Sequence, residues 1–276
     1  MVNTSYLTIR TTLIILLTSL ISGCGSWPSI FEKSRAGDGA PAGGINVSNI
    51  RDAIPRAEPR SRSGNPRKYT VLGRTYRVMQ DSRGFSEQGV ASWYGTKFHG
   101  RRTSSGETYD MYAMTAAHKS LPLPTYVQVT NMQNGRQVIV KVNDRGPFHD
   151  NRIIDLSYAA ATKLGITGGG TGLVEIHALD PTRGQPRPVR NNLALPGRDA
   201  DLYLQVGAFT DQNNAERLSQ RLQNDMNRPV RIQTAVGYDQ TLYRVQVGPM
   251  KNVEQADTTS MHLAQLGIRD MRLIIE

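Results

Sequence analysis

Three polar clusters in the middle of the chain hold the side chains best suited to chemistry. Glu107 lies in a loop of glycine and serine, with Trp93 and Tyr94 upstream of it. Asp144 stands just before an Arg-Gly-Pro turn, and His118 follows two alanines between these clusters. Cleavage of a glycan needs a carboxyl group beside a glycosidic oxygen, and aromatic rings offer flat platforms for sugar faces. The residue types therefore indicate a site for a sugar polymer.

Each of these residues also has an ordinary structural explanation. Asp144 can cap a turn, because its short side chain reaches nearby backbone N–H groups. Glu107 can be a solvated acid of a loop, and His118 can be a hydrogen-bonded residue of a barrel wall. Spacing alone favours the structural explanation for each residue taken singly, and only their combination favours a site.

Short strands must position these clusters. A helix is predicted over 155–165, with Ser157 as its N-terminal cap and Gly165 as its end. Several strands with one helix, in a segment of this size, predict a small β-barrel whose loops carry the polar clusters. The strand-like runs are 69–78, which contains a glycine turn, 90–94, 126–130, 137–142 and 172–178.

The C-terminal part of the chain contains an internal repeat. The sequence Gln-Val-Gly occurs at 205–207 and again at 246–248, each time inside a strand-like run. Each copy is followed by a helical pattern and a further strand, which predicts a four-stranded sheet with two helices on one face, as in ferredoxin-like βαββαβ folds. The predicted helices are 213–226 and 253–266, and the closing strands are 230–234 and 271–275.

Alternation along these strands predicts a polar sheet face opposite the helices. In the first strand Tyr203, Gln205, Gly207 and Phe209 share a face, whereas Leu204, Val206 and Ala208 share the other. In the third strand Arg244 and Gln246 alternate with Tyr243, Val245 and Val247. Aromatic, amide and guanidinium groups suit a hydroxyl-rich ligand. A sheet of this kind can also bind RNA, or bind nothing.

The N-terminus has the pattern of an export signal. Residues 11–21 are apolar and uncharged, and this run is shorter than the roughly 20 residues that span a bilayer. Leu20 to Cys24 follows at once and resembles a bacterial lipobox, which implies acylation of Cys24 and a membrane anchor. Gly25 in place of an aspartate favours the outer membrane. The alternative is an ordinary signal peptide in which Cys24 has no role.

The composition is that of a basic, exported protein of two domains. The 276 residues include 33 Lys/Arg and 23 Asp/Glu, a net charge of +10. Part of this excess falls in Pro- and Arg-rich connecting segments, which argues against nucleic-acid binding. Five scattered histidines and one cysteine predict neither a metal site nor a cofactor. The predicted segments are a signal peptide at 1–23, a flexible tether at 24–65, the barrel domain at 66–180, a linker at 181–200 and the repeat domain at 201–276.

Four motifs in one order resemble the rare lipoprotein A family over residues 66–180. They are Ala-Ser-Trp-Tyr-Gly at 91–95, Thr-Ser-Ser-Gly-Glu at 103–107, Ala-His-Lys-Ser-Leu-Pro at 117–122 and Val-Asn-Asp-Arg-Gly-Pro at 142–147. Ser104 is a small departure, since alanine is common there in the family. Residues 201–276 resemble the sporulation-related repeat (SPOR) domain.

The resemblance implies a six-stranded double-psi β-barrel, a fold shared with expansins and some lytic transglycosylases. It implies catalytic roles for Glu107, His118 and Asp144, with Asp144 or Glu107 as the acid/base. Trp93, Tyr94 and Arg145 would contact the sugar. Asp155 resembles a segment of expansins and is either a third acid of the site or part of the start of the following helix.

The function implied is lytic cleavage of peptidoglycan strands at the division septum. The C6 hydroxyl of muramic acid attacks its own anomeric carbon, so one carboxyl group can first give and then take a proton. The SPOR resemblance implies binding of strands stripped of stem peptides through Tyr203, Gln205, Arg244 and Gln246, near division-site proteins. The alternative is a non-catalytic, expansin-like protein that binds the wall.

Overall fold

The computed structural model describes residues 38–149, 151–182, 200–237 and 240–276. The predicted signal peptide, Cys24 and most of the predicted linker lie outside the described residues. Within the described ranges, no helix is long and apolar enough to cross a bilayer.

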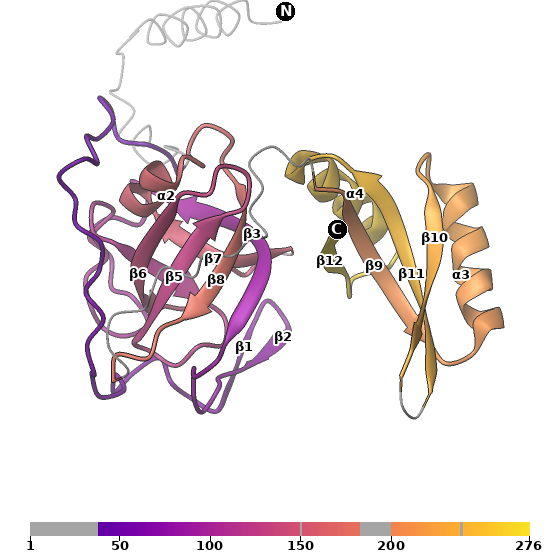
Figure 1. Ribbon diagram of the computed structural model, residues 1–276, viewed down its shortest axis with the longest axis horizontal. Helices are drawn as coiled ribbons and strands as arrows, with labels where there is room; N and C mark the ends of the chain where they lie inside the picture. Colours follow the sequence, from indigo (N-terminus) through magenta and orange to yellow (C-terminus); the bar gives the residue numbers. More distant parts are fainter. Residues whose placement is uncertain (1–37, 150, 183–199, 238–239) are drawn as a thin grey trace, which may run out of the picture. The chain divides into compact units, whose positions relative to one another are not determined.

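Six strands close into a barrel in the order β3-β7-β4-β6-β5-β8, which confirms the predicted six-stranded barrel (Figure 1). The sheet is mixed, because β3 pairs with β7 and β4 pairs with β6 in parallel, whereas the other neighbours are antiparallel. The strands are β3 (Ser86–Tyr94), β4 (Thr115–His118), β5 (Thr125–Asn131), β6 (Gln137–Asp144), β7 (Arg152–Ser157) and β8 (Gly172–Ala178).

The barrel core is filled by aliphatic side chains that alternate along the strands. On β6, Val138, Val140 and Val142 point inward and are almost completely buried. A small barrel has room only for side chains in its interior, so it is a packed core and not a channel. Lys141 is on the opposite face of β6, so its side chain points to the outer surface of the barrel.

The one helix of the barrel domain, α2 (Tyr158–Leu164), begins and ends at the predicted caps. The Ser157 side chain accepts a hydrogen bond from the backbone N–H of Ala160, and Gly165 adopts a left-handed conformation with φ of 75°. The predicted segment 155–165 begins two residues before this cap, and the alternative that Asp155 is part of the start of the helix is wrong. Asp155 belongs to β7, which extends to the cap, so its side chain is placed by strand pairing.

Residues 38–65, which we call the strap, lie along the barrel. The prediction of a flexible tether therefore needs correction for this segment, while residues 24–37 lie outside the described ones. Strand β6 extends past the end of β4, which pairs with it only from Lys141 onward. The strap forms hydrogen bonds with the backbone of Ile139, which β4 leaves uncovered. Ala53 N donates to the Ile139 carbonyl at 3.0 Å, and Ile139 N donates to Asp52 Oδ2 at 3.0 Å.

A short hairpin precedes the barrel. Strands β1 (Lys68–Val71) and β2 (Arg74–Arg77) pair around Leu72 and Gly73, both of which have positive φ. Two central residues of positive φ are the requirement of a type I′ turn, and the glycine meets it without strain. This confirms the two short strands expected around a glycine.

The C-terminal domain is a four-stranded antiparallel sheet in the order β10-β11-β9-β12 with two helices, which confirms the ferredoxin-like prediction. Its core joins Leu204 and Val247 of the sheet to Leu222 and Leu263 of the helices. The elements are β9 (Leu202–Phe209), α3 (Gln212–Asp225), β10 (Val230–Val236), β11 (Thr241–Met250), α4 (Val253–Gln265) and β12 (Arg272–Ile275).

An irregularity in β9 corrects the predicted face assignment near its end. Gln246 of β11 faces Gln205, but the preceding residue Val245 faces Gly207, so Val206 is an extra residue on β9. Beyond it the alternation is reversed. Phe209 consequently packs against the hydrophobic core and does not lie on the polar face.

Candidate active site

The loop that carries Glu107 lies against the end of β6, which carries Asp144. Ser105 N donates to the Asn143 carbonyl at 3.1 Å, and Ser104 donates to Asp144 Oδ1 from its backbone N at 2.8 Å and its hydroxyl at 2.6 Å. The loop that leads to Glu107 is therefore anchored to the strand end that carries Asp144, while a close approach of the two carboxylates stays a prediction.

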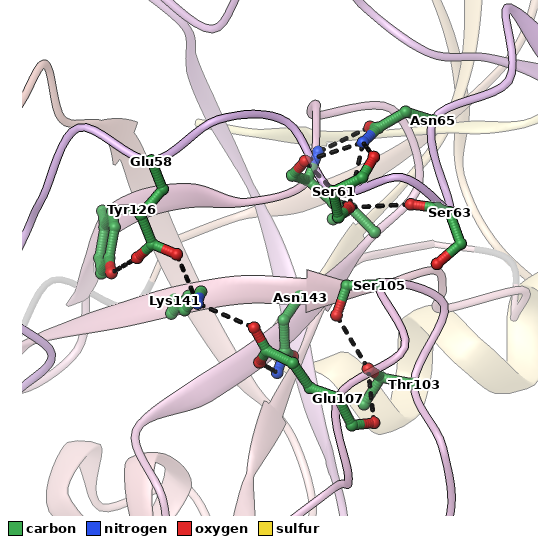
Figure 2. Close-up of polar contacts among 11 residues, drawn as sticks. Glu58, Ser61, Ser63, Asn65, Thr103, Ser105, Glu107, Tyr126, Lys141 and Asn143 are labelled. Atoms are coloured by element: carbon green, nitrogen blue, oxygen red, sulfur yellow. Dashed lines mark hydrogen bonds and ion pairs between the residues drawn. The ribbon is translucent and has the colours of Figure 1, made fainter.

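Glu107 is held by two donors that share one face of β6. Lys141 Nζ lies 2.8 Å from Glu107 Oε1, and Asn143 Nδ2 donates to Oε2 at 2.7 Å (Figure 2). Residues two apart on a strand point to the same side, so this pair forms a fork for the carboxylate. The Glu107 side chain remains 45% exposed, so a ligand can reach it.

One carboxylate oxygen of Asp144 caps the turn that follows β6. Its Oδ1 accepts hydrogen bonds from both donors of Ser104 and from Arg145 N, the latter at 2.7 Å. These bonds are those of a turn cap, so the structural explanation for Asp144 holds for Oδ1. Its Oδ2 has no hydrogen-bond donor among the residues that the structure describes, so this oxygen takes no part in the cap.

Asp155 is a third acid of the same region. Ala117 on β4 pairs with Asp144 on one side and Asp155 on the other. Two interstrand spacings of roughly 4.8 Å put the backbones of the two acids about 10 Å apart. A Cβ on Gly146 would lie 3.8 Å from the Ala117 Cβ and 3.9 Å from Asp155 Oδ2, so the turn after Asp144 passes over the Asp155 carboxylate.

The environment of Asp155 favours its protonated form. Burial raises the pKa of this carboxyl above its usual value, although the hydrogen bond from the Ser92 hydroxyl opposes the shift. A carboxyl group with a raised pKa is what a general acid at neutral pH requires. The sequence indicated Asp155 only as an alternative, because its burial depends on strand pairing.

His118 is a buried, hydrogen-bonded residue of the barrel wall. Its Nδ1 accepts from the backbone N–H groups of Ser120 and Leu121, at 3.2 and 3.0 Å. The proton therefore lies on Nε2, which faces Glu87 Oε2 at 3.5 Å. The described hydrogen bonds of the ring include neither Glu107 nor Asp144, so a catalytic role for His118 stays a prediction.

We expect His118 to make stability depend on pH. Burial lowers the pKa of His118 below 6.5, and this exceeds the opposite effect of Glu87. The unfolded chain then takes up a proton near pH 6.5 that the folded protein does not, so stability is lost as pH falls through this value. Chemical unfolding from about pH 7.5 to about pH 5.5 should show a smaller loss for His118→Gln than for the parent. Equal losses would contradict this account.

Three residues predicted to contact sugar make contacts within the barrel domain, and for Trp93 and Arg145 a sugar contact stays a prediction. Tyr94 is only 8% exposed and stacks on Tyr109 with 4.1 Å between ring centres, so it cannot be a sugar platform. Trp93 packs on Tyr158 at the edge of the core. Arg145 donates to backbone carbonyls, including that of Gly64 on the strap at 2.8 Å, because its half-buried guanidinium needs acceptors.

The polar face of the C-terminal sheet contains a row of side chains, one from each strand. Arg231 pairs with Gln246, Gln246 with Gln205, and Gln205 with Arg272. Directly paired residues point to the same face, so the row crosses the whole sheet. Alternation along the strands predicts the two glutamines on this face. The two arginines lie in the outer strands, so their place on it depends on the strand register.

Arg231 covers two of the predicted ligand contacts. Its guanidinium stacks on the Tyr203 ring at 3.5 Å, and its Nε donates to Gln246 Oε1 at 2.8 Å. Tyr203 is 7% exposed and Gln246 is fully buried, so the expectation that they contact a ligand directly is corrected. The accessible groups of this face are those of Arg231, Gln205, Arg244 and Arg272.

The closed barrel and the C-terminal sheet define a double-psi β-barrel protein with a SPOR-type domain. The family model described as "Lytic transglycolase" matches residues 86–176, and the SPOR domain model matches residues 199–271. The chain belongs to the RlpA family, because its sequence is 41% identical to a Pseudomonas aeruginosa member over 83% of this chain and 82% of that protein.

A second relative agrees with this membership. A Vibrio cholerae protein is 42% identical over 90% of each chain. Both relatives are named endolytic peptidoglycan transglycosylase RlpA. The crystal structure of the RlpA SPOR domain from Pseudomonas aeruginosa is 33% identical and covers 26% of this chain and 96% of that one, with a TM-score of 0.26.

Proposed function

We propose that the barrel is an endolytic peptidoglycan transglycosylase that leaves 1,6-anhydromuramic ends. Two observations carry the proposal: Asp144 and Asp155 both pair with Ala117 on the strand between them, and the loop that leads to Glu107 is bonded to the strand end that carries Asp144. Membership of a family whose curated members have this name supports it.

The three acids take different roles. Asp155 has the raised pKa, so it protonates the leaving glycosidic oxygen. The C6 hydroxyl then attacks the anomeric carbon: the C1–O6 bond forms, the glycosidic bond breaks, and the hydroxyl proton passes to Asp155. Asp144 faces the positive charge of the oxocarbenium-like transition state through Oδ2, and Glu107 orients the sugar. Asp144 as the proton carrier is the alternative assignment.

The C-terminal sheet binds the same polymer without its peptides. The Arg-Gln-Gln-Arg row crosses a flat sheet surface, where guanidinium and amide groups can bond sugar hydroxyls and the lactyl carboxylates of muramic acid. Stem peptides would replace those carboxylates by amides and keep the strand from the sheet. A preference for stripped strands follows.

Export and lipidation complete the proposed function. Acyl chains on Cys24 would anchor the protein at the outer membrane, with the tether carrying the barrel toward the wall. Stripped strands at the division septum would concentrate it there, near division-site proteins. The lipobox-like sequence that ends at Cys24 supports this placement.

The products of digestion test the proposed reaction. Purified protein is incubated with intact and with amidase-treated peptidoglycan, and the released fragments are analysed by mass spectrometry. We expect 1,6-anhydro ends, mainly from the amidase-treated material. Hydrated reducing ends would contradict the mechanism. Binding with no release would favour the expansin-like alternative.

A further inference from the structure

Glu58 of the strap contacts the active site although it lies outside both segments matched by family models. We propose that Glu58 is a positioning residue for catalysis, which fixes Lys141 and through it the Glu107 carboxylate. The proposal rests on the proposed function, because it assigns a role to Glu107 in glycan cleavage. On this proposal the strap contributes a residue to the active site.

The contact runs through one ammonium group. Lys141 Nζ lies 3.0 Å from Glu58 Oε2 and 2.8 Å from Glu107 Oε1, between the two carboxylates (Figure 2). A lysine side chain has a flexible four-carbon stem, so a single partner leaves it several positions. The Glu58 carboxylate, on the other side of the ammonium group, restricts Lys141 to the position in which it contacts Glu107.

Glu58 is itself fixed and charged. Its Oε1 accepts a hydrogen bond from the Tyr126 hydroxyl, and this bond lowers the pKa of Glu58 more than burial raises it. Lys141 lowers the pKa of Glu58 further. Tyr126 is on β5, so the carboxylate is tied to the barrel wall and does not move with the strap alone.

The charge on Lys141 depends on both acids. Burial lowers the pKa of Lys141, but hydrogen bonds and attraction from Glu107 and Glu58 together raise it above its usual value. The Lys141 side chain is 20% exposed, so it is only partly screened by water. The two carboxylates therefore hold it as a cation in one place.

The strap is anchored on both sides of Glu58. On one side Ala53 and Asp52 bond Ile139, and on the other side Asn65 bonds Leu123 in both directions, at 2.8 Å each. These bonds connect the strap to two separate parts of the barrel. A residue between two fixed points can act as a rigid support for a catalytic group.

The first test is the charge-removing variant Glu58→Gln in the full chain. Glutamine keeps the shape and can still accept from Tyr126, but it loses the charge that fixes Lys141. We expect kcat for release of anhydro products to fall about tenfold, with KM within about twofold, because Glu58 does not touch the substrate. Glu216→Gln, an exposed acid on α3, is the matched control and should keep parent kinetics.

A second measurement separates positioning from general damage to the strap. The ammonium of Lys141 is titrated by nitrogen-edited NMR in the parent and in Glu58→Gln. We expect a lower pKa for Lys141 in the variant, because one of its two carboxylate partners has lost its charge. An unchanged Lys141 titration, or an unchanged kcat, would overturn the proposal.

The variant Glu107→Gln separates this proposal from the proposed function. If Glu107→Gln keeps full activity, the role given to Glu107 in cleavage fails, whatever Glu58 does. If Glu107→Gln is impaired while Glu58→Gln has parent kinetics, only the positioning role of Glu58 fails.

Discussion

Asp144→Asn is expected to lower the rate of glycan cleavage by about 100- to 1000-fold while the barrel stays folded. Asparagine retains a carbonyl oxygen in the place of Oδ1, so it still accepts the hydrogen bonds of Ser104 and Arg145. What is lost is the negative charge, which Oδ2 presents to the substrate. The initial rate of anhydro-product release, with circular dichroism as the check on folding, measures the effect.

The Asp144 prediction has a matched control at the other partner of the cap. Ser104→Ala removes the hydroxyl that bonds Asp144 Oδ1 but leaves the carboxylate charged. We expect it to keep the parent rate within about threefold, since the carboxylate keeps its charge and its two backbone donors, Ser104 N and Arg145 N. A folded Asp144→Asn that cleaves at near the parent rate would show that Asp144 only caps the turn.

The contact between the loop of Glu107 and the strand end at Asp144 could be predicted because both stand in short polar motifs beside strands. A loop rich in glycine and serine and an Asp before a Gly-Pro turn both mark the ends of elements, where barrels carry their sites. The caps of α2 could be predicted for a similar local reason. Ser157 and Gly165 act on backbone groups within a few residues, so no distant contact decides them.

The sequence alone could not decide the role of residues whose environment depends on distant strands. The raised pKa of Asp155 comes from burial between β3 and β4, and Arg231 depends on the register of β10 against β11. The strap has the composition of a linker, yet it binds because β6 leaves backbone groups of Ile139 uncovered. Tyr94 shows the converse, because an aromatic residue beside a functional loop is often part of the core.

Asp155→Asn tests the proton carrier, and it should abolish most activity while making the protein more stable. Loss of a general acid/base costs about 100- to 10,000-fold in rate. Because burial disfavours ionisation of this carboxyl group, the folded parent is destabilised at neutral pH relative to the unfolded chain, in which Asp155 ionises freely. The amide does not ionise, so Tm should rise by about 2 to 4 °C. Anhydro-product release and thermal unfolding measure the two effects on the same samples.

The rise in Tm expected for Asp155→Asn should depend on pH in a definite direction. The pKa of Asp155 is raised above 3.8 in the folded protein, so between 3.8 and the raised value the folded state holds a proton that the unfolded chain has lost. Stability of the parent therefore falls as pH rises through this window, whereas asparagine does not titrate. The Tm difference between variant and parent should be largest near neutral pH and should disappear as pH approaches 3.8. A variant that is less stable than the parent near neutral pH would contradict this account of the pKa of Asp155, and one that still cleaves would assign the proton to Asp144 instead.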